Sequence, residues 1–306
     1  MTEQIATGAD AVLPFQVDDL GVRGRLVRIN ETANPLLIAE RYPAAVAALL
    51  LDTLVLTALL ASTLKYDGVF SLQIQGDGPV SLLVADARTN GDLRAYGKYD
   101  ETALDETLSK TEGLLPHLVG AGHMAFTVDQ GPDTERYQGI TELTGETLAE
   151  SAANYFRLSE QLDTVIISAQ NKTSNSQSGI TAAALMVQRL PNADPQDDDA
   201  ADAWREAAVL AGSVKPNELL DPHLSAEELL FRLYHQNGVR VFSPQPVRYA
   251  CRCSRERVSQ TLASFPREEV ENMRVDENIA VTCEYCGTAY AFGESDLDAL
   301  FSMAQT

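Results

Sequence analysis

The four cysteines of this chain stand in two close pairs, and this spacing constrains the fold more than any other feature. Cys251-Arg252-Cys253 and Cys283-Glu284-Tyr285-Cys286 contain every cysteine of the 306 residues. Each pair can present two thiolates on a short turn, and the insert between the pairs is long enough to hold a helix and fold back. Such spacing is typical of a tetrahedral zinc site with four cysteine ligands. Two structural disulfides in an exported protein, or unrelated buried cysteines, are the alternatives.

The charge of the chain restricts its partners. With 23 Lys and Arg against 44 Asp and Glu, the formal net charge is −21. This argues against binding to nucleic acid or to an anionic membrane, because both require a basic surface. The segment Met1–Ile5 has neither the basic nor the apolar part of a signal peptide. We therefore expect a cytoplasmic protein in a reducing compartment, where such cysteines serve as metal ligands or redox sensors rather than as permanent bridges.

One apolar segment, residues 44–64, is about long enough to span a bilayer. Asp52 lies close to its middle, where a charge costs about 2.5–3.5 kcal/mol on insertion scales. Four hydroxyl side chains make it still less suited to lipid: Thr53, Thr57, Ser62 and Thr63. The sequence predicts a helix buried in a protein core, with Pro43 in its first turn and Gly68 as its stop.

The rest of the first 190 residues contains short segments with the patterns of strands and two with the patterns of helices. The predicted strands are 22–29, 69–75, 80–85, 93–96, 123–128, 136–140 and 164–167. The apolar pattern predicts two helices, at residues 147–162 and 179–190, and the second of them is strongly apolar. Because most strands are neighbours in the chain, we expect an α+β domain with a mixed or largely antiparallel sheet.

The composition changes near residue 193. Asn192–Asp199 is polar and acidic, which indicates a loop or a domain boundary. Short helices are expected over residues 203–214 and, from the capping-box pattern at Ser225-Ala226-Glu227-Glu228, up to His235. Isolated helices of this length are marginal in water, so these helices must be stabilised by packing on another part of the protein.

The C-terminal segment has too few residues for a large core. Ser254 is placed to cap one helix and Ser295 to cap a last one, with a strand predicted at 279–282. A metal must therefore supply much of the stability, and structural zinc contributes an apparent ~10–16 kcal/mol in small peptides. We expect this segment to unfold when the metal is lost. The predicted parts are a core domain (1–193), a helical linker (194–238) and a zinc domain (239–306).

Seven stretches spread along the chain are similar to those of one family. They are Val22–Arg28, Lys65–Gly68, Leu72–Pro79, Tyr137–Ile140, Tyr155–Gln161, Cys251–Arg257 and Cys283–Cys286. On these stretches the chain resembles the 33 kDa chaperonin family, the redox-regulated heat-shock chaperones of bacteria. The Cys-x-Cys and Cys-x-x-Cys pairs, with the Ser-Arg-Glu-Arg after the first, are the most specific part. Gly120–His123 departs from the family's pattern, at a turn.

The resemblance implies a holdase, an ATP-independent chaperone that is not an enzyme. One zinc ion would be bound in the reduced state by Cys251, Cys253, Cys283 and Cys286. Oxidation would join Cys251 to Cys253 and Cys283 to Cys286, release the zinc, and unfold the zinc domain and the linker. The activated protein would then hold unfolding client proteins in the cytoplasm, usually as a homodimer.

Three other functions are compatible with parts of this cysteine pattern. A zinc-ribbon module that binds nucleic acid would need a basic face, but residues 240–306 hold 7 Lys and Arg against 10 Asp and Glu. A thiol–disulfide oxidoreductase could use the second cysteine pair, but Gly287 follows where a helix would be expected. The third is a constitutive structural zinc site on an unrelated enzyme.

No catalytic constellation is predicted. The histidines are dispersed and receive no catalytic role: His117, His123, His223 and His235. Arg255 and Arg257, beside the first cysteine pair, either tune the thiolates or face solvent.

Overall fold

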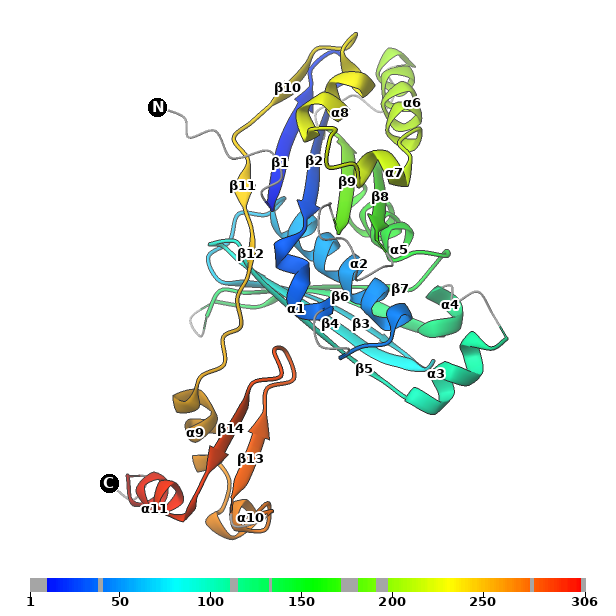
Figure 1. Ribbon diagram of the computed structural model, residues 1–306. Helices are drawn as coiled ribbons and strands as arrows, with labels where there is room; N and C mark the ends of the chain where they lie inside the picture. The colour runs from blue at the N-terminus through cyan, green and yellow to red at the C-terminus, as the bar shows by residue number, and fades with distance from the viewer. Residues whose placement is uncertain are drawn as a thin grey trace. The chain divides into compact units, whose positions relative to one another are not determined.

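The computed structural model describes residues 10–37, 41–110, 115–131, 134–171, 181–190, 198–275 and 278–303. The chain forms two compact units, Met1–Tyr249 and Ala250–Thr306. Figure 1 shows the helices and strands of each unit.

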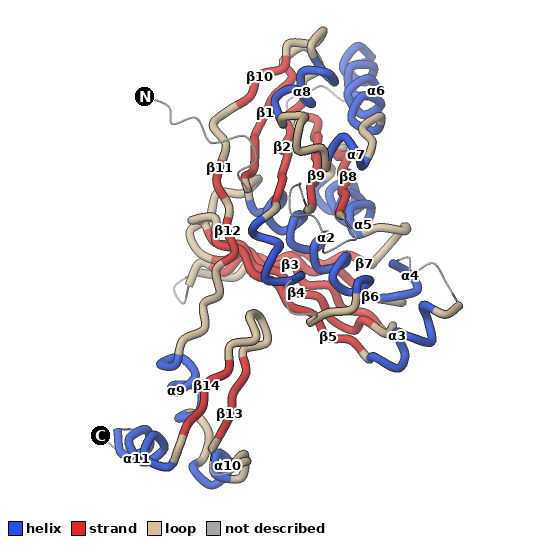
Figure 2. Tube along the Cα trace, viewed as in Figure 1, coloured by secondary structure: helices blue, strands red, loops and turns tan. Residues whose placement is uncertain are grey.

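Two six-stranded sheets form the frame of the N-terminal unit (Figure 2). The strands of sheet A are β1 (Ala11–Val17), β2 (Val22–Ile29), β8 (Thr164–Gln170), β9 (Ala182–Arg189), β10 (Val239–Val241) and β11 (Gln245–Pro246). Those of sheet B are β3 (Val69–Gly76), β4 (Val80–Arg88), β5 (Asp92–Tyr99), β6 (Gly122–Asp129), β7 (Tyr137–Glu142) and β12 (Arg248–Tyr249).

Almost all strand pairs in the two sheets are antiparallel. Sheet A has the order β10-β1-β2-β9-β8, with β11 also paired to β1, and sheet B has the order β12-β5-β4-β3-β6-β7. Only β12 runs parallel to its neighbour, β5, among the described strands. The predicted α+β fold with a largely antiparallel sheet is confirmed.

The apolar segment is helix α2 (Ala44–Ala61), which packs between the two sheets. Of its residues, 83% are buried inside the protein. The helix is apolar all round because both of its sides face a sheet. The prediction of a core helix is confirmed, although the helix ends earlier than expected.

Sheet A carries apolar side chains on both faces. Along its central strand, β9, Met186 belongs to the core around α2, whereas Leu185 belongs to a second core on the opposite face. Seven of the eight positions of β9 are buried. A strand buried on both faces has a continuous apolar sequence, and for this reason residues 179–190 resembled a helix. That prediction is wrong; residues 179 and 180 themselves lie outside the described residues.

Three helices cover the second face of sheet A: α6 (Asp198–Gly212), α7 (Pro216–Leu219) and α8 (Ala226–Tyr234). Figure 1 shows them beside strands β1, β2, β8 and β9. The predicted capping box begins α8, with Ser225 Oγ accepting from Glu228 N (3.1 Å) and Ser225 N donating to Glu228 Oε2 (3.0 Å). These short helices are therefore stabilised by packing on the sheet, as expected. Most of the acidic run at 192–199 lies outside the described residues.

An extended segment follows α8, and we call residues 239–249 the strap. Its strands β10 and β11 pair with β1 at the edge of sheet A, and its strand β12 pairs with β5 at the edge of sheet B. A single residue, Ala250, separates the strap from Cys251. The predicted division into a core domain (1–193), a helical linker (194–238) and a zinc domain (239–306) stays a prediction.

The other helices of this unit are short. The predicted helix at 147–162 is α5 (Leu148–Tyr155), which continues as a π-helix (Phe156–Glu160). Strand β1 was not predicted, because Pro14 interrupts its apolar run and a proline argues against a strand. Four short helical segments were not predicted either, because they are too short to show a helical period. These segments are a 3-10 helix (Glu31–Ala33), α1 (Asn34–Leu37), α3 (Glu101–Leu108) and α4 (Leu115–Leu118).

The C-terminal unit has a small core. Its elements are α9 (Arg255–Ala263), α10 (Arg267–Glu271), β13 (Ile279–Thr282), β14 (Ala289–Phe292) and α11 (Glu294–Met303). Among its described residues, the buried apolar core consists of Leu262, Val270, Ile279, Phe292 and Leu297. Ser254 caps α9 as predicted, because its Oγ accepts from Arg257 N (3.2 Å). The predicted cap at Ser295 is wrong: α11 already begins at Glu294.

Candidate metal centre

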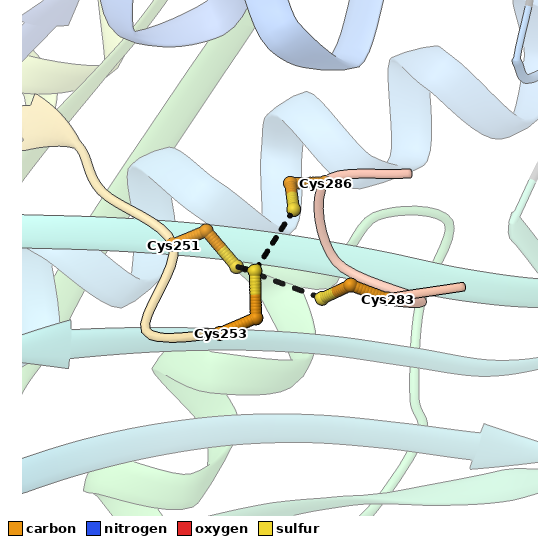
Figure 3. A group of neighbouring side chains, drawn as sticks. All are labelled: Cys251, Cys253, Cys283 and Cys286. Atoms are coloured by element: carbon orange, nitrogen blue, oxygen red, sulfur yellow. Dashed lines mark hydrogen bonds between the residues drawn. The ribbon is translucent and has the colours of Figure 1, made fainter. Parts of the chain in front are cut away.

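Two loops of the C-terminal unit bring the four cysteines together (Figure 3). The first loop lies between the strap and α9 and carries Cys251 and Cys253. Arg257, in the first turn of α9, donates from Nη1 to Arg252 O (2.7 Å). The helix cap and this bond hold the first loop against the start of α9.

The second loop is the turn that joins β13 to β14. Cys283 N donates to Thr288 O (2.9 Å), and Gly287 N donates to Cys283 O (2.8 Å). Gly287 has a φ of 73°, which is in the left-handed region that glycine tolerates best. The turn is therefore tight, and it directs Cys283 and Cys286 toward the first loop (Figure 3).

The geometry of the sulfur atoms suits a tetrahedral metal ion. All four Sγ atoms lie within 4.8 Å of one another. Cys251 Sγ lies 3.4 Å from Cys253 Sγ and 3.6 Å from Cys283 Sγ, and Cys253 Sγ lies 3.3 Å from Cys286 Sγ. Zinc–sulfur bonds of about 2.3 Å would place the sulfurs about 3.8 Å apart. The residues therefore fit a four-thiolate site, and the four cysteines are free of disulfides.

The distances do not select one pattern of disulfides. The contact between the loops, Cys253 to Cys286, is as short as the contact within the first pair, Cys251 to Cys253. The pairing of near neighbours therefore stays a prediction.

Two side chains that contact the sulfurs were not predicted. Tyr290 Oη donates to Cys253 Sγ (3.1 Å), and Cys286 Sγ lies at hydrogen-bond distance, 3.2 Å, from Thr288 Oγ1. Thr288 immediately precedes β14 and Tyr290 is its second residue, so the two side chains are two positions apart in the chain. The spacing of these two polar side chains directly after the second cysteine pair is the sequence signal that could have indicated their contacts with the sulfurs.

The surroundings shift the pKa values of the cysteine thiols in different directions. Burial raises the pKa of the Cys251 thiol to about 12. Burial also pushes the pKa of Cys286 upward, but hydrogen bonds with Thr288 and with the neighbouring thiols outweigh this and lower it to about 6. A divalent cation at the centre would favour the thiolate at every ligand.

Arg255 joins elements of the C-terminal unit. Its Nη2 lies 3.0 Å from Asp296 Oδ2, its Nη1 donates to Ala291 O (2.7 Å), and its Cζ lies 4.4 Å from the centre of the Phe292 ring. This side chain therefore ties the start of α9 to β14 and α11. Arg255 is also 44% exposed, so it faces solvent as well, which is one of the two alternatives considered from the sequence.

The histidines do not join the cysteine cluster. His117 lies in α4 and His123 in β6, and His223 and His235 lie before and after α8. Within the described ranges, no other group of three or more His, Cys, Asp or Glu side chains is close enough to hold a metal.

Comparison with known proteins gives matches along nearly the whole chain. Residues 10–293 match the family described as "Hsp33 protein". The 33 kDa chaperonin of Caulobacter vibrioides is 38% identical over 286 residues, which are 92% of this chain and 94% of that protein. The 33 kDa chaperonin of Shewanella denitrificans is 39% identical over 96% of this chain and 95% of its own.

A solved structure has the same fold. The crystal structure of the 33 kDa chaperonin (Heat shock protein 33 homolog) from Thermotoga maritima superposes with a TM-score of 0.76 at 20% sequence identity, covering 96% of this chain and 98% of that one.

Proposed function

The chain belongs to the Hsp33 family of 33 kDa chaperonins, and from this premise we propose that it is a holdase whose activity is controlled by the redox state of its four cysteines. A chaperone of this kind binds unfolding proteins and catalyses no reaction. The observation that carries the proposal is the cluster of four sulfurs in a unit whose buried apolar core, as described, has five residues.

Zinc is the metal that the donor set favours, because four thiolates in tetrahedral geometry are typical of structural zinc sites. When bound, the metal would link the two cysteine loops and keep the thiols deprotonated. Arg257 and Tyr290 would keep the loops and the Cys253 sulfur in position. Four thiolates are also readily oxidised where oxidant can reach them.

Oxidation converts these ligands into groups that cannot hold the metal. In the proposed step, Cys251 with Cys253, and Cys283 with Cys286, each lose two electrons and form a disulfide. A peroxide takes up two electrons and two protons per disulfide and is reduced to water, or to water and an alcohol. Each bridge closes only a small loop, so it constrains the unfolded chain little. The C-terminal unit therefore loses its metal without gaining a comparable constraint.

We propose that the loss of order then reaches the linker through the strap. The strap precedes Cys251 by one residue, and α7 and α8 are short helices that depend on docking to sheet A. Release of α6, α7 and α8 would uncover an apolar face of sheet A. Its side chains include Leu13, Phe15, Val17, Leu26, Leu185 and Val187. An apolar sheet face of this kind suits the exposed apolar segments of unfolding proteins.

The partners of the activated form would be unfolded or oxidatively damaged proteins, and we propose that the activated form is a homodimer. The site of action would be the cytoplasm, because a reducing compartment keeps the thiols reduced and the chaperone silent until oxidant appears.

The proposal is tested by measuring bound zinc, free thiols and the aggregation of a denatured client protein on the same samples. After peroxide at mildly raised temperature, we expect one zinc released per chain, all four thiols lost and aggregation of the client suppressed. Reductant should reverse these changes. Retention of zinc and thiols under strong oxidant, or complete oxidation without protection of the client, would contradict the proposal. A variant with all four cysteines changed to serine controls for oxidation elsewhere in the chain.

A further inference from the structure

A cavity of about 490 Å³ lies within the N-terminal unit, and the redox centre does not explain it. Six aromatic residues line it: Tyr66, Phe70, Phe126, Tyr137, Tyr155 and Phe156. Two lining residues, Leu64 and Tyr137, are 43% and 53% exposed, so the cavity reaches the surface. Its volume is within the range of small-molecule sites, about 300–1,000 Å³.

One wall of the cavity has a specific local structure. Glu160 Oε1 accepts hydrogen bonds from Tyr137 Oη (2.9 Å) and Tyr155 Oη (2.7 Å). Glu160 ends the π-helix, and Gln161 after it has a φ of 55°, which is uncommon for a residue with a side chain. A Cβ at Gly139 would lie 2.3 Å from Tyr155 Oη. Glycine at this position therefore allows the phenol to reach the carboxylate.

The cavity also has two cationic lining residues, Arg23 and Lys65. In the described part of the chain neither forms an ion pair or a side-chain hydrogen bond, although the protein has 44 acidic residues. The one carboxylate in the lining, Glu160, is engaged by the two phenols. The cavity is thus net positive in a chain whose net charge is −21.

We propose that this cavity binds a small amphipathic organic anion, with its apolar body among the aromatic rings and its carboxylate head on Arg23 and Lys65. Guanidinium and ammonium groups form charge-assisted hydrogen bonds with carboxylates. A neutral occupant, such as an apolar side chain of an unfolded protein, would leave both cations unpaired. The body would be aliphatic or aromatic, because the lining is largely apolar.

This site also gives a role to segments that the redox centre leaves unused. Four of the seven stretches that carry the family resemblance contribute lining residues: Val22–Arg28, Lys65–Gly68, Tyr137–Ile140 and Tyr155–Gln161. None of them contains a cysteine. The inference is therefore independent of the proposed redox function, and each can fail without the other.

The test is calorimetric titration of the reduced, full-length protein with decanoate, far below the concentration at which decanoate forms micelles. We expect one saturable site per chain. Decanol, which has the same chain without the charge, should bind about tenfold more weakly or worse, as should decanoate to the double variant Arg23→Gln/Lys65→Gln. The matched control is Lys98→Gln, which removes an exposed lysine that does not line the cavity, and it should bind like the parent.

A second measurement locates the ligand. Decanoate should slow hydrogen–deuterium exchange in residues 156–162 and leave 279–292 unchanged. If the double variant melts at a lower temperature than the parent, the single variant Lys65→Gln, at an exposed position, provides the comparison. Absence of saturable binding, equal binding of decanol, or unchanged affinity in the charge variants would overturn the proposal.

Discussion

At the scale of single residues, Asp52 is a carboxyl group buried in the middle of α2. It is 7% exposed, and its Oδ1 has no hydrogen-bond partner among the described residues. Burial raises its pKa to about 6, and a hydrogen bond with Ser168 offsets only part of this effect. The charged carboxylate of Asp52 therefore destabilises the folded protein. The core helix α2 thus carries a local electrostatic penalty at this residue.

Because of this penalty, we predict that Asp52→Asn raises the free energy of unfolding by an amount that depends on pH. The folded pKa lies above the ordinary value of 3.8, so the folded state binds the proton more tightly than the unfolded state. The penalty is small below about pH 4, grows up to about pH 6 and is constant above it. The variant should be more stable by up to about 3 kcal/mol at pH 7.5 and by roughly half of that at pH 5. Urea unfolding followed by circular dichroism at the two pH values measures this.

A matched substitution at Asp86 compares a buried carboxylate that has an ion pair with the buried carboxylate of Asp52. Asp86 is also buried, but it lies 2.6 Å from Arg94 Nη2 and accepts a hydrogen bond from Ser71. Asp86→Asn should therefore destabilise the protein at pH 7.5. A loss of stability in Asp52→Asn at that pH would show that its carboxylate has a favourable partner.

At the scale of secondary-structure elements, one arginine attaches the linker helices to sheet A. Arg28, on β2, donates from Nη2 to Glu218 O (3.0 Å) and from Nη1 to Leu224 O. These carbonyl groups belong to α7 and to the segment before α8. The linker is thus held by two polar bonds in addition to its apolar contacts.

We predict that Arg28→Met loosens the linker in the reduced protein without loss of zinc. The two hydrogen bonds contribute about 1–3 kcal/mol to docking, so amides of α7 and α8 should exchange with deuterium about tenfold faster or more. Partial protection of a client without oxidant should accompany this change. Arg23→Met, on the opposite face of the same strand, is the control and should leave the exchange of α7 and α8 unchanged. If both variants behave alike, Arg28 does not anchor the linker.

At the scale of the whole molecule, the two units differ in what stabilises them. The N-terminal unit has two extensive cores, one around α2 and one under the linker helices. The described core of the C-terminal unit has five buried residues. A metal bound by four thiolates would supply the missing stability in the smaller unit only.

Removal of the metal by a chelator, under reducing conditions, should therefore unfold the C-terminal unit and leave the N-terminal unit folded. We expect rapid deuterium exchange throughout residues 255–303, while β2, β3, β4 and β9 stay protected. The cysteine-to-serine variant should show the same pattern without chelator. Continued protection of β13 and β14 after complete loss of metal would show that the small core is sufficient.

Local patterns determined several features. The spacing of the two cysteine pairs predicted that four sulfurs would meet, the capping residues Ser225 and Ser254 predicted two helix starts, and the length and composition of α2 predicted a core helix. Each of these predictions rests on a short local pattern, a close pair of cysteines, a capping residue or a single apolar run, whose geometry limits the outcome.

Other features were decided only by the tertiary structure. The segment ending at Arg189 is a strand, because it is covered on both faces by elements distant in sequence, which its own apolar composition could not reveal. The contact of Tyr290 with Cys253, and the cavity that joins Arg23, Lys65 and Tyr155, also arise from long-range packing. Sequence patterns record which side chains avoid water, but which surface covers them depends on how distant elements meet.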